Sequence, residues 1–454
     1  MPKIDEYLAA EAGRFEAELC ELLRIPSVST DPQYRDHIQR AAEWTADQFR
    51  RLQFATEIIP TAGHPLVYAE SPGIEGAATA LVYGHYDVQP PDPLEKWISP
   101  PFEPTVREGN LYARGATDDK GQMFTHIKST EAWIRAEGRL PVNLKFIIEG
   151  EEEIGSRSLA TYIVEQKKRL SCDCVVISDT AQFAPGVPSI VYGLRGIAYY
   201  ELRLTGPNRD LHSGTFGGSV TNPANALAAM LDGLIGSHGV IQIPGFYDDV
   251  VPLSDREREQ FAALPFHERA YLDQFGVEGT SGEEGFTVLE RRWARPTFDV
   301  SGLWSGYQGE GAKTILPATA GAKFSFRLVP DQDPEKIAVG LKQKLAELCP
   351  PGIEWELIGH HGSPGVLIPL ESPYMAAAAR AIEHAFGVPP VYTREGGSIP
   401  IVNTFHDVLM ADVLLIGWGQ NDDNTHGPNE KFSLADFHRG IKASARLWSE
   451  LPGA

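Results

Sequence analysis

Short apolar runs alternate with segments of helical periodicity along most of the chain. The apolar runs short enough to be strands occupy residues 78–83, 144–148, 174–177 and 413–416. Apolar residues recur at helical spacing over residues 4–24, 37–53, 120–137, 156–168, 223–234, 372–386 and 433–451. Strands that are apolar throughout and separated by helices are typical of a sheet covered on both faces. The pattern therefore predicts an α/β fold.

The pattern changes in the middle of the chain. Residues 197–204 and 322–328 alternate apolar and polar side chains, which is typical of strands with one exposed face. We therefore expect an α+β domain over residues 194–370, inserted into an α/β domain that comprises residues 1–193 and 371–454. The α/β domain would then be discontinuous in the sequence.

The composition is acidic. The 61 Asp and Glu residues exceed the 40 Lys and Arg residues, so the formal net charge is −21 over 454 residues. Such a charge disfavours nucleic acids and anionic membranes as partners. No apolar run approaches the roughly 18 residues of a membrane span, and the charged N-terminal segment lacks the features of a signal peptide. The four cysteines show no metal-binding spacing, and we expect reduced thiols in a cytoplasmic protein.

Side chains that bind metals follow each of the four predicted apolar strands. His85 and Asp87 follow the first strand, Glu151-Glu152-Glu153 follow the second, and Asp179 follows the third. His426 lies in the polar loop after the fourth. In open α/β sheets, functional groups gather at the carboxyl ends of the strands. We therefore expect these side chains to meet at one edge of the sheet.

Taken singly, each of these residues also has an ordinary structural interpretation. His85 and Asp87 could lie in a surface loop, and Asp87 could orient His85 instead of binding a metal directly. Asp118-Asp119 precedes a predicted helix and could be an N-cap, or a carboxylate there could bridge two cations. The three adjacent glutamates could form a solvated acidic turn, or one could bind metal while its neighbour acts as a general base.

His, Asp and Glu ligands without thiolates fit Zn²⁺, Mn²⁺ or Co²⁺. Two such ions about 3.5–4 Å apart can share a bridging water, lower its pKa and polarise a substrate carbonyl. An adjacent glutamate then takes the proton of the water and passes it to the leaving amine. The residues by themselves thus indicate a two-metal hydrolase.

Several multi-residue motifs occur in an order that resembles one known family. They are Gly84-His85-Tyr86-Asp87-Val88-Gln89-Pro90, Ala113-Arg114-Gly115, Asp118-Asp119-Lys120-Gly121, Glu152-Glu153-Ile154-Gly155-Ser156, Tyr192-Gly193-Leu194-Arg195-Gly196, Asp210-Leu211-His212-Ser213-Gly214, Arg327-Leu328-Val329-Pro330 and Arg394-Glu395-Gly396-Gly397-Ser398-Ile399-Pro400. From about residue 15 onward the chain resembles the M20 metallopeptidases, and most closely their branch of carnosine and cytosolic nonspecific dipeptidases. The resemblance implies a zinc-peptidase-like catalytic domain with an inserted α+β lid and dimerisation domain.

The resemblance also implies five metal ligands. These are His85 and Asp179 for one ion, Glu153 and His426 for the other, and Asp118 as the bridge between them. Glu152 would be the general base, and Asp87 would support catalysis by orienting His85 without binding metal. The peptide bond between Asp118 and Asp119 would be cis.

The substrate would be held by residues of the inserted domain and of the later chain. By resemblance, His212 reaches into the active site of the partner subunit in a homodimer and stabilises an oxyanion. Arg327 would clamp the terminal carboxylate of the substrate, a task that suits a planar bidentate donor. Further substrate contacts would come from Thr314, His361, Ser398 and Asn225.

Two features depart from the family pattern. Glu151 would add a charge beside Glu152. The loop over residues 302–310 carries Trp304 and Tyr307, which either shape the substrate pocket or simply pack.

We expect a metal-dependent dipeptidase that cleaves dipeptides or short peptides with a free C-terminal carboxylate. The alternative is an N-acyl amino acid deacylase of the aminoacylase or desuccinylase type, because the same two-metal core serves both kinds of amide. A non-catalytic binding protein with this fold should have lost a ligand or the base. Here all five ligands and Glu152 are present.

Overall fold

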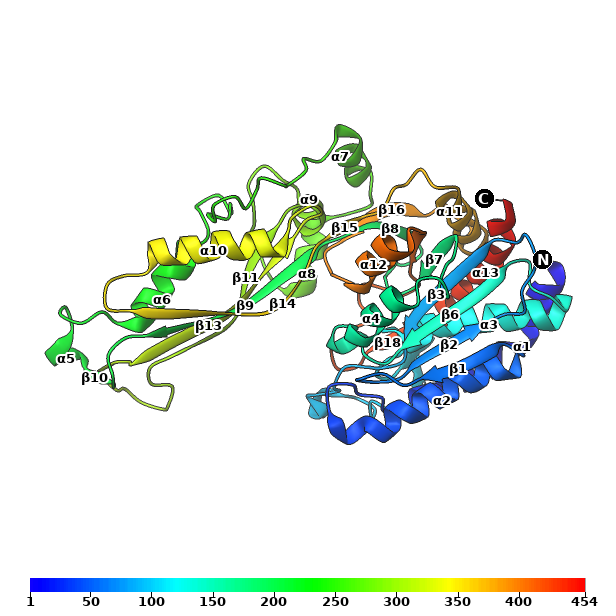
Figure 1. Cartoon of the computed structure of the whole chain (residues 1–454), viewed down its shortest axis with the longest axis horizontal. Helices are drawn as coiled ribbons and strands as arrows, with labels where there is room; N and C mark the ends of the chain where they lie inside the picture. The colour runs from blue at the N-terminus through cyan, green and yellow to red at the C-terminus, as the bar shows by residue number, and fades with distance from the viewer. Residues whose placement is uncertain (454) are drawn as a thin grey trace. The chain divides into compact units, whose positions relative to one another are not determined.

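The four apolar runs predicted as strands are neighbours in one sheet of the computed structural model, which describes residues 1–453 (Figure 1). In their order across the sheet they are β6 (Asn143–Glu149), β3 (Thr79–His85), β7 (Cys174–Ile177) and β17 (Asp412–Ile416). The pairing is parallel, with Val82 opposite Phe146 and Val176, and Leu414 opposite Val176. Parallel strands in register end at the same edge, so the residues that follow them reach that edge, as predicted.

The chain divides into two units. Unit 1 comprises Met1–Tyr192, Ile368–Thr393 and the described residues from Ile401 onward, and unit 2 comprises Gly193–Leu367 and Arg394–Pro400. The predicted division differs at the segment Arg394–Pro400. There Arg394 forms an ion pair with Glu257, and the Gly396 carbonyl accepts a hydrogen bond from Arg195. These bonds attach the segment to unit 2.

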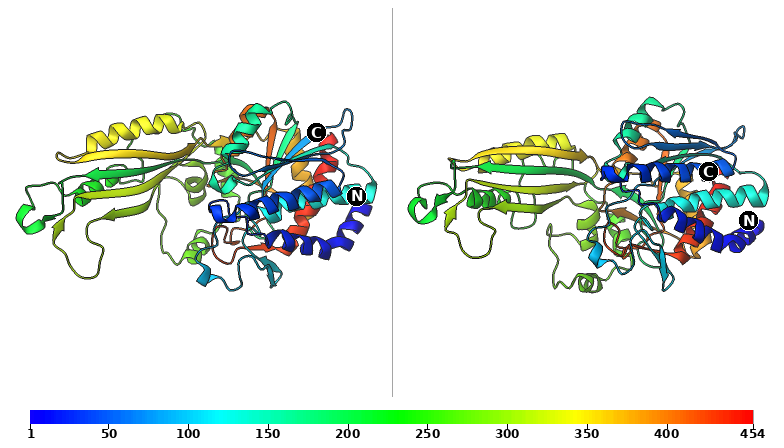
Figure 2. Two further views of the ribbon diagram at one scale, coloured as in Figure 1. Left: turned by 60° about the horizontal axis from the view of Figure 1, so that its bottom comes forward. Right: turned by 90° about the horizontal axis from the view of Figure 1, so that it is seen from below.

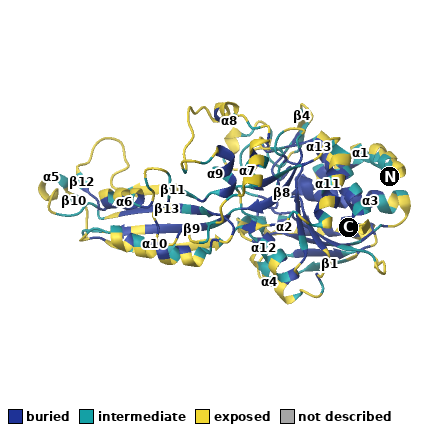
Figure 3. Cartoon of the chain, turned by 90° about the horizontal axis from the view of Figure 1, so that it is seen from above, coloured by how far each residue is buried: buried dark blue, intermediate teal, exposed yellow. Residues whose placement is uncertain are grey.

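Helices cover the sheet of unit 1. The helices predicted for this part of the chain correspond to α1 (Pro2–Leu23), α2 (Arg35–Arg51), α3 (Lys120–Glu137), α4 (Arg157–Glu165), α11 (Pro373–Phe386) and α13 (Leu434–Glu450). Figure 1 shows α4 on one face of the sheet and α3 and α13 on the other. In Figure 3 the dark blue of buried residues is concentrated in the strands between them, which is why these strands are apolar throughout.

The remaining elements of unit 1 are short. They are β1 (Ala55–Ile59), β2 (Leu66–Glu70), β4 (Thr105–Arg107), β5 (Asn110–Tyr112), β18 (Lys431–Ser433), α12 (Ile401–Thr404), the 3₁₀ turns Pro32–Tyr34, Leu94–Lys96, Glu152–Ile154 and Leu451–Gly453, and the π turn Phe405–Leu409. Two strands, β8 (Ser189–Leu194) and β16 (Val391–Glu395), begin in unit 1 and end in unit 2. β1 and β2 extend the sheet beyond β6, and β8 continues it beyond β17. β1 and β2 pair antiparallel with each other, and β2 with β6.

Unit 2 contains a four-stranded antiparallel sheet in the order β11-β13-β9-β14. Its elements are β9 (Gly196–Thr205), β10 (Leu211–His212), α5 (Ser213–Phe216), α6 (Pro223–Asp232), α7 (Asp255–Ala262), α8 (Glu268–Phe275), α9 (Val288–Ala294), β11 (Thr297–Ser305), β12 (Ile315–Leu316), β13 (Thr319–Leu328), α10 (Pro334–Leu348), β14 (Glu354–Ser363) and β15 (Val366–Leu367). Figure 2 shows α10, in yellow, running along the sheet. Leu202, Phe324 and Leu341 are fully buried in the core between sheet and helices.

Among residues 1–453, no helix combines the length and the apolar composition that crossing a membrane requires.

Candidate metal centre

His85, Asp118 and Asp179 form one group of candidate metal ligands at the carboxyl edge of the central strands. One ligand atom of each lies within 4.8 Å of the others. His85 ends β3 and is fully buried. Its Nε2 lies 3.1 Å from Asp118 Oδ1 but has no hydrogen-bond partner among the described residues. A bound cation would supply the partner that this buried ring nitrogen lacks, and the neighbouring carboxylates would bind the same ion.

Asp118 also belongs to a second group, with Glu153 and His426, whose ligand atoms again lie within 4.8 Å of one another. His426 Nε2 is 2.9 Å from Asp118 Oδ2 and 3.4 Å from Glu153 Oε2. The two oxygens of Asp118 thus face different histidines, His85 and His426. This is the geometry that a carboxylate bridging two cations requires.

The cluster holds more negative charge than its two histidines balance. Burial raises the pKa of Glu152 to about 7, and burial followed by the nearby charge of Asp118 raises the pKa of Glu153 and of Asp179 well above the usual range. Burial alone would lower the pKa of His85, but the nearby carboxylates of Asp118 and Asp87 raise it. Bound cations would stabilise the ionised carboxylates and displace the imidazole protons. The donor set therefore fits divalent metal ions.

Asp87 occupies a different position from the ligands. Its carboxylate is fully buried and accepts hydrogen bonds from the backbone N–H groups of Glu152, at 3.3 Å, and Glu153, at 3.1 Å. Its Oδ1 lies 3.4 Å from Nδ1 of His85, on the side of the ring away from Asp118. This geometry favours the interpretation in which Asp87 orients His85 and holds the turn that carries the glutamates.

The peptide bond between Asp118 and Asp119 is cis, as the resemblance implied. α3 begins directly after it at Lys120. Asp119 stands at the N-cap position, but its side chain makes no capping hydrogen bond; it accepts one from the backbone N–H of His85 instead, at 3.2 Å. The ordinary N-cap interpretation is therefore wrong for this pair.

Glu151 does not point toward the cluster. Its carboxylate accepts hydrogen bonds from the backbone N–H groups of His64, at 3.0 Å, and Ser158, at 3.1 Å. A Cβ atom at Gly63 would lie only 1.4 Å from Glu151 Oε1, so the loop before β2 closes tightly over this side chain. Glu151 therefore holds the loop at residue 63 and the first turn of α4. The expectation that Glu151 adds charge beside Glu152 was wrong, because its side chain points toward His64 and Ser158 instead.

The candidate substrate residues lie in unit 2, and two pairs of them are brought together. Arg327 on β13 donates a hydrogen bond to the Ser398 hydroxyl at 3.1 Å. The backbone N–H of Ser213, next to His212, donates to the Thr314 carbonyl at 3.2 Å, where β10 pairs with β12. His361 on β14 stacks on the ring of Tyr199, with centroids 5.4 Å apart. Asn225 is exposed on α6.

The two large aromatics within residues 302–310 are both exposed, but Trp304 lies on β11, whereas Tyr307 follows that strand. The ring of Trp304 covers Gly321 on the neighbouring strand, where a Cβ atom would lie 2.2 Å from the indole. Tyr307 is exposed, and its hydroxyl donates to the carbonyl of Glu310 at 2.8 Å. The Trp304 ring therefore packs on the sheet of unit 2 with part of its surface exposed.

Three residues around the cluster were not singled out from the sequence. Gln89 donates a hydrogen bond to Glu153 Oε2 at 2.7 Å. Arg114 and Glu430, both buried, form an ion pair of 2.8 Å beside Asp118. Gln89 and Arg114 fall within two of the motifs that resemble the M20 metallopeptidases, and this was the only sign of them in the sequence. Glu430 lies outside those motifs, so only its acidic side chain marked it.

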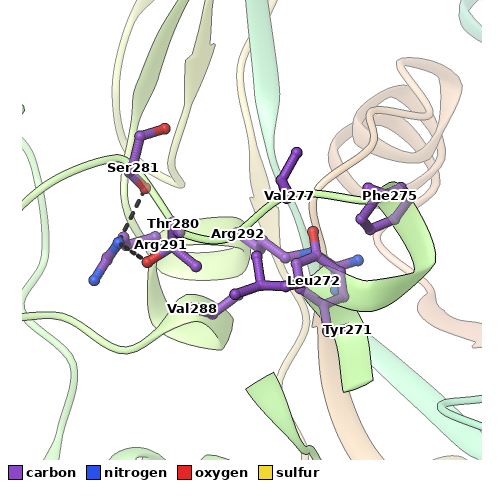
Figure 4. A pocket seen from close by; sticks show the side chains of 10 residues that line it. Tyr271, Leu272, Phe275, Val277, Thr280, Ser281, Val288, Arg291 and Arg292 are labelled. Carbon is purple, nitrogen blue, oxygen red and sulfur yellow. Dashed lines mark hydrogen bonds between the residues drawn. The ribbon is translucent and has the colours of Figure 1, made fainter. Parts of the chain in front are cut away.

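A cavity of about 310 Å³ lies elsewhere, in unit 2 between α8 and α9 (Figure 4). Tyr271 and Phe275 of α8 line it, and Arg291 at its side is held by hydrogen bonds to the Thr280 hydroxyl, at 3.2 Å, and the Ser281 carbonyl, at 3.0 Å. None of the predicted site residues lines this cavity. The candidate metal ligands lie instead at the sheet edge of unit 1.

Comparison with known proteins gives consistent matches. The model of peptidase family M20/M25/M40 matches residues 81–450. The Cys-Gly metallodipeptidase dug1 of Schizosaccharomyces pombe is 32% identical over 99% of this chain and 98% of its own length. The Beta-Ala-His dipeptidase of Homo sapiens is 32% identical over 99% of this chain and 92% of its own length. A solved structure of the di-peptidase Dug1p from Saccharomyces cerevisiae has a TM-score of 0.87 at 31% identity and covers 100% of this chain and 98% of that one.

Proposed function

The chain belongs to peptidase family M20 and is a metallo-dipeptidase of that family, and from this premise we propose that it cleaves dipeptides with a free C-terminal carboxylate at a centre for two divalent cations. The observation that carries the proposal is the position of Asp118, whose two carboxylate oxygens face His85 and His426 from within two overlapping ligand groups. Relatives are named for Cys-Gly and Beta-Ala-His, so dipeptides of these two kinds are the proposed substrates.

The proposed ligands are His85 and Asp179 for one ion, Glu153 and His426 for the other, and Asp118 for both. Nitrogen and carboxylate ligands of this kind accept Zn²⁺, Mn²⁺ and Co²⁺. When bound, the ions supply Lewis-acid polarisation of the substrate carbonyl and lower the pKa of water.

Glu152 is the proposed general base. It accepts a proton from the attacking water and later donates that proton to the leaving amine nitrogen. Burial supports this role, because the raised pKa of Glu152, about 7, suits a group that both accepts and donates a proton near neutral pH. The hydrogen bond from the backbone N–H of Glu152 to Asp87 holds the base in place.

Arg327, with Ser398, is proposed to bind the carboxylate of the substrate, and Thr314, His361 and Asn225 are proposed as further contacts. His212 is proposed to act in the active site of the partner subunit of a homodimer. Its Nδ1 accepts a hydrogen bond from the Gly214 backbone N–H at 3.0 Å. The neutral ring then carries its proton on Nε2, where it can be donated to an oxyanion.

A cytoplasmic location is part of the same proposal. Its support is that all four cysteines are free, as is usual for proteins of reducing compartments.

The activity is tested with Cys-Gly and β-Ala-His beside N-acetyl amino acids, each with added Zn²⁺ or Mn²⁺. We expect hydrolysis of the dipeptides; hydrolysis of the acyl substrates alone would overturn the assignment to dipeptides. The base is tested with Glu152→Gln, for which kcat should fall by at least about 100-fold while both metals are retained. Glu151→Gln is the matched control, because it changes the neighbouring carboxylate, and it should keep its turnover. Equal losses in both variants would refute the role of Glu152.

The role of His212 is tested by complementation. His212→Ala and Glu152→Gln should each be inactive as purified proteins. If His212 acts across the interface, subunit exchange should restore up to about a quarter of wild-type activity, because half of the dimers are mixed and one of their two sites is intact. A mixture as inactive as its components, although exchange is complete, would contradict the cross-subunit role.

A further inference from the structure

The Glu430 carboxylate accepts four hydrogen bonds from one short segment. Its Oε2 accepts from Nη1 of Arg114 and from the backbone N–H of Gly115, both at 2.8 Å. Its Oε1 accepts from the backbone N–H groups of Thr117, at 2.9 Å, and Asp118, at 3.1 Å. Glu430 is fully buried. One side chain thus fixes the backbone that ends at the shared carboxylate of the cluster.

Arg114 extends this arrangement to two other segments. Its Nη2 donates to the carbonyl of Gly427 at 3.1 Å and to the carbonyl of Pro90 at 3.3 Å. Gly427 is the residue after His426, and Pro90 lies shortly after His85 and Asp87 in the chain. The ion pair therefore joins the segments next to three of the five candidate ligands, His85, Asp118 and His426.

We propose that Glu430 is a positioning residue that sets the distance between Asp118 and His426, with Arg114 as its buried counter-charge; the proposal rests on the metal centre described above. Multiple bonds to an ionised acceptor are stronger than bonds between neutral groups. Without the Glu430 carboxylate, a buried guanidinium and three backbone N–H groups would lose their acceptor, so the segment would move to find others. Because the N–H of Asp118 is one of these donors, its carboxylate would move away from the 2.9 Å contact with His426.

The test is a titration of metal-free enzyme with Co²⁺, followed by visible absorption, for wild type and Glu430→Gln. The glutamine has nearly the same shape but lacks the charge and presents an N–H₂ group where two donors already point. We expect Co²⁺ to bind about 10–100-fold more weakly, with an altered absorption spectrum. Arg114→Lys keeps the charge but loses the forked contacts to Gly427 and Pro90, and it should show a smaller loss in the same direction.

Glu131→Gln is the matched control. Glu131 lies on α3, which begins directly after Asp119, and it is buried in an ion pair of 2.8 Å with Lys128. This variant should lose stability to a similar degree, while its Co²⁺ affinity and spectrum stay those of the wild type. A general loss of rigidity in unit 1 would instead weaken Co²⁺ binding in both variants, and that result would overturn the positioning role.

Wild-type Co²⁺ affinity and spectrum in Glu430→Gln would also overturn the proposal. If Glu430→Gln does not fold, the Co²⁺ titration of Arg114→Lys tests the proposal instead. Wild-type Co²⁺ affinity in Arg114→Lys would then overturn the positioning role. Failure of the proposed metal centre is distinguishable, because the wild-type protein itself would then bind fewer than two Co²⁺ ions. Failure of the dipeptide assignment alone would leave two Co²⁺ ions bound and would appear only in the substrate assays.

Discussion

His126 of α3 is fully buried, and its burial predicts a specific loss of stability in acid. The hydroxyls of Ser178 and Ser444 each lie 2.7 Å from one of its ring nitrogens. A neutral imidazole has one donor and one acceptor, so two hydroxyls satisfy it without a charge. No carboxylate is among these partners, and burial lowers the pKa of His126 to about 3.

The size of the effect follows from the difference between the folded and unfolded chains. In the unfolded chain the pKa of histidine is about 6.5. Below this value the unfolded chain takes up a proton that the folded protein does not, so the stability contributed by neutral His126 is fully present above pH 6.5 and is lost as the pH falls toward 3. Each pH unit below 6.5 lowers the free energy of unfolding by about 1.4 kcal/mol, so the loss at pH 4.5 is about 2.7 kcal/mol.

The assay compares urea unfolding of wild type and His126→Gln at pH 7.5, 6.5, 5.5 and 4.5. Unfolding is followed by tryptophan fluorescence, to which the buried Trp418 and Trp448 of unit 1 contribute. Glutamine keeps a donor and an acceptor but does not titrate. The stability of wild type relative to the variant should therefore fall by about 2.7 kcal/mol between pH 7.5 and 4.5, whereas titration of other groups cancels in the comparison.

A difference between wild type and His126→Gln that stays constant between pH 7.5 and 4.5 would refute the argument, because it would mean that the folded protein accommodates the charged ring.

Three further outcomes are expected. Removing divalent cations with EDTA should lower the Tm measured by calorimetry, because ions present at 100 times their Kd contribute about 2.7 kcal/mol; an unchanged Tm would contradict a metal centre in this cluster. Glu151→Ala should cost about 1–2 kcal/mol in urea unfolding, because it removes the acceptor at the start of α4, and should leave kcat nearly unchanged; a stable but inactive variant would show that Glu151 takes part in catalysis. Trp304→Ala should destabilise unit 2 by about 1 kcal/mol, because the indole covers Gly321, whereas Tyr307→Ala should not; equal effects would show that the cover over Gly321 contributes nothing.

The sequence predicted the central sheet well because its signal is strong there. Apolar runs such as 174–177 are buried on both faces, and parallel pairing then fixes where the following His, Asp and Glu residues lie. β1 was not predicted, since Ala55–Ile59 is half exposed and short, and neither apolar composition nor alternation marks it. The family resemblance was confirmed by the comparisons, whereas the roles of the individual site residues remain proposals.

Other features depend on contacts between distant segments, which no local pattern records. Glu430 acquires its surroundings from Arg114, and the two are separated by 316 positions in the chain. The direction of the Glu151 side chain is set by the close approach of the loop at Gly63. In both cases the residue type was visible in the sequence, but its partners were not.

The discontinuity of unit 1 has a consequence during synthesis on the ribosome. β17 is inserted in the sheet between β7 and β8, and both His426 and Glu430 follow it in the chain. Asp179 therefore leaves the ribosome roughly 250 residues before His426, which is on the order of 10–50 s at typical elongation rates. During that interval the nascent chain has the first three strands that candidate ligands follow, but it has neither β17 nor the candidate ligand His426. The complete set of candidate ligands thus becomes available only after the segment through His426 has been synthesised.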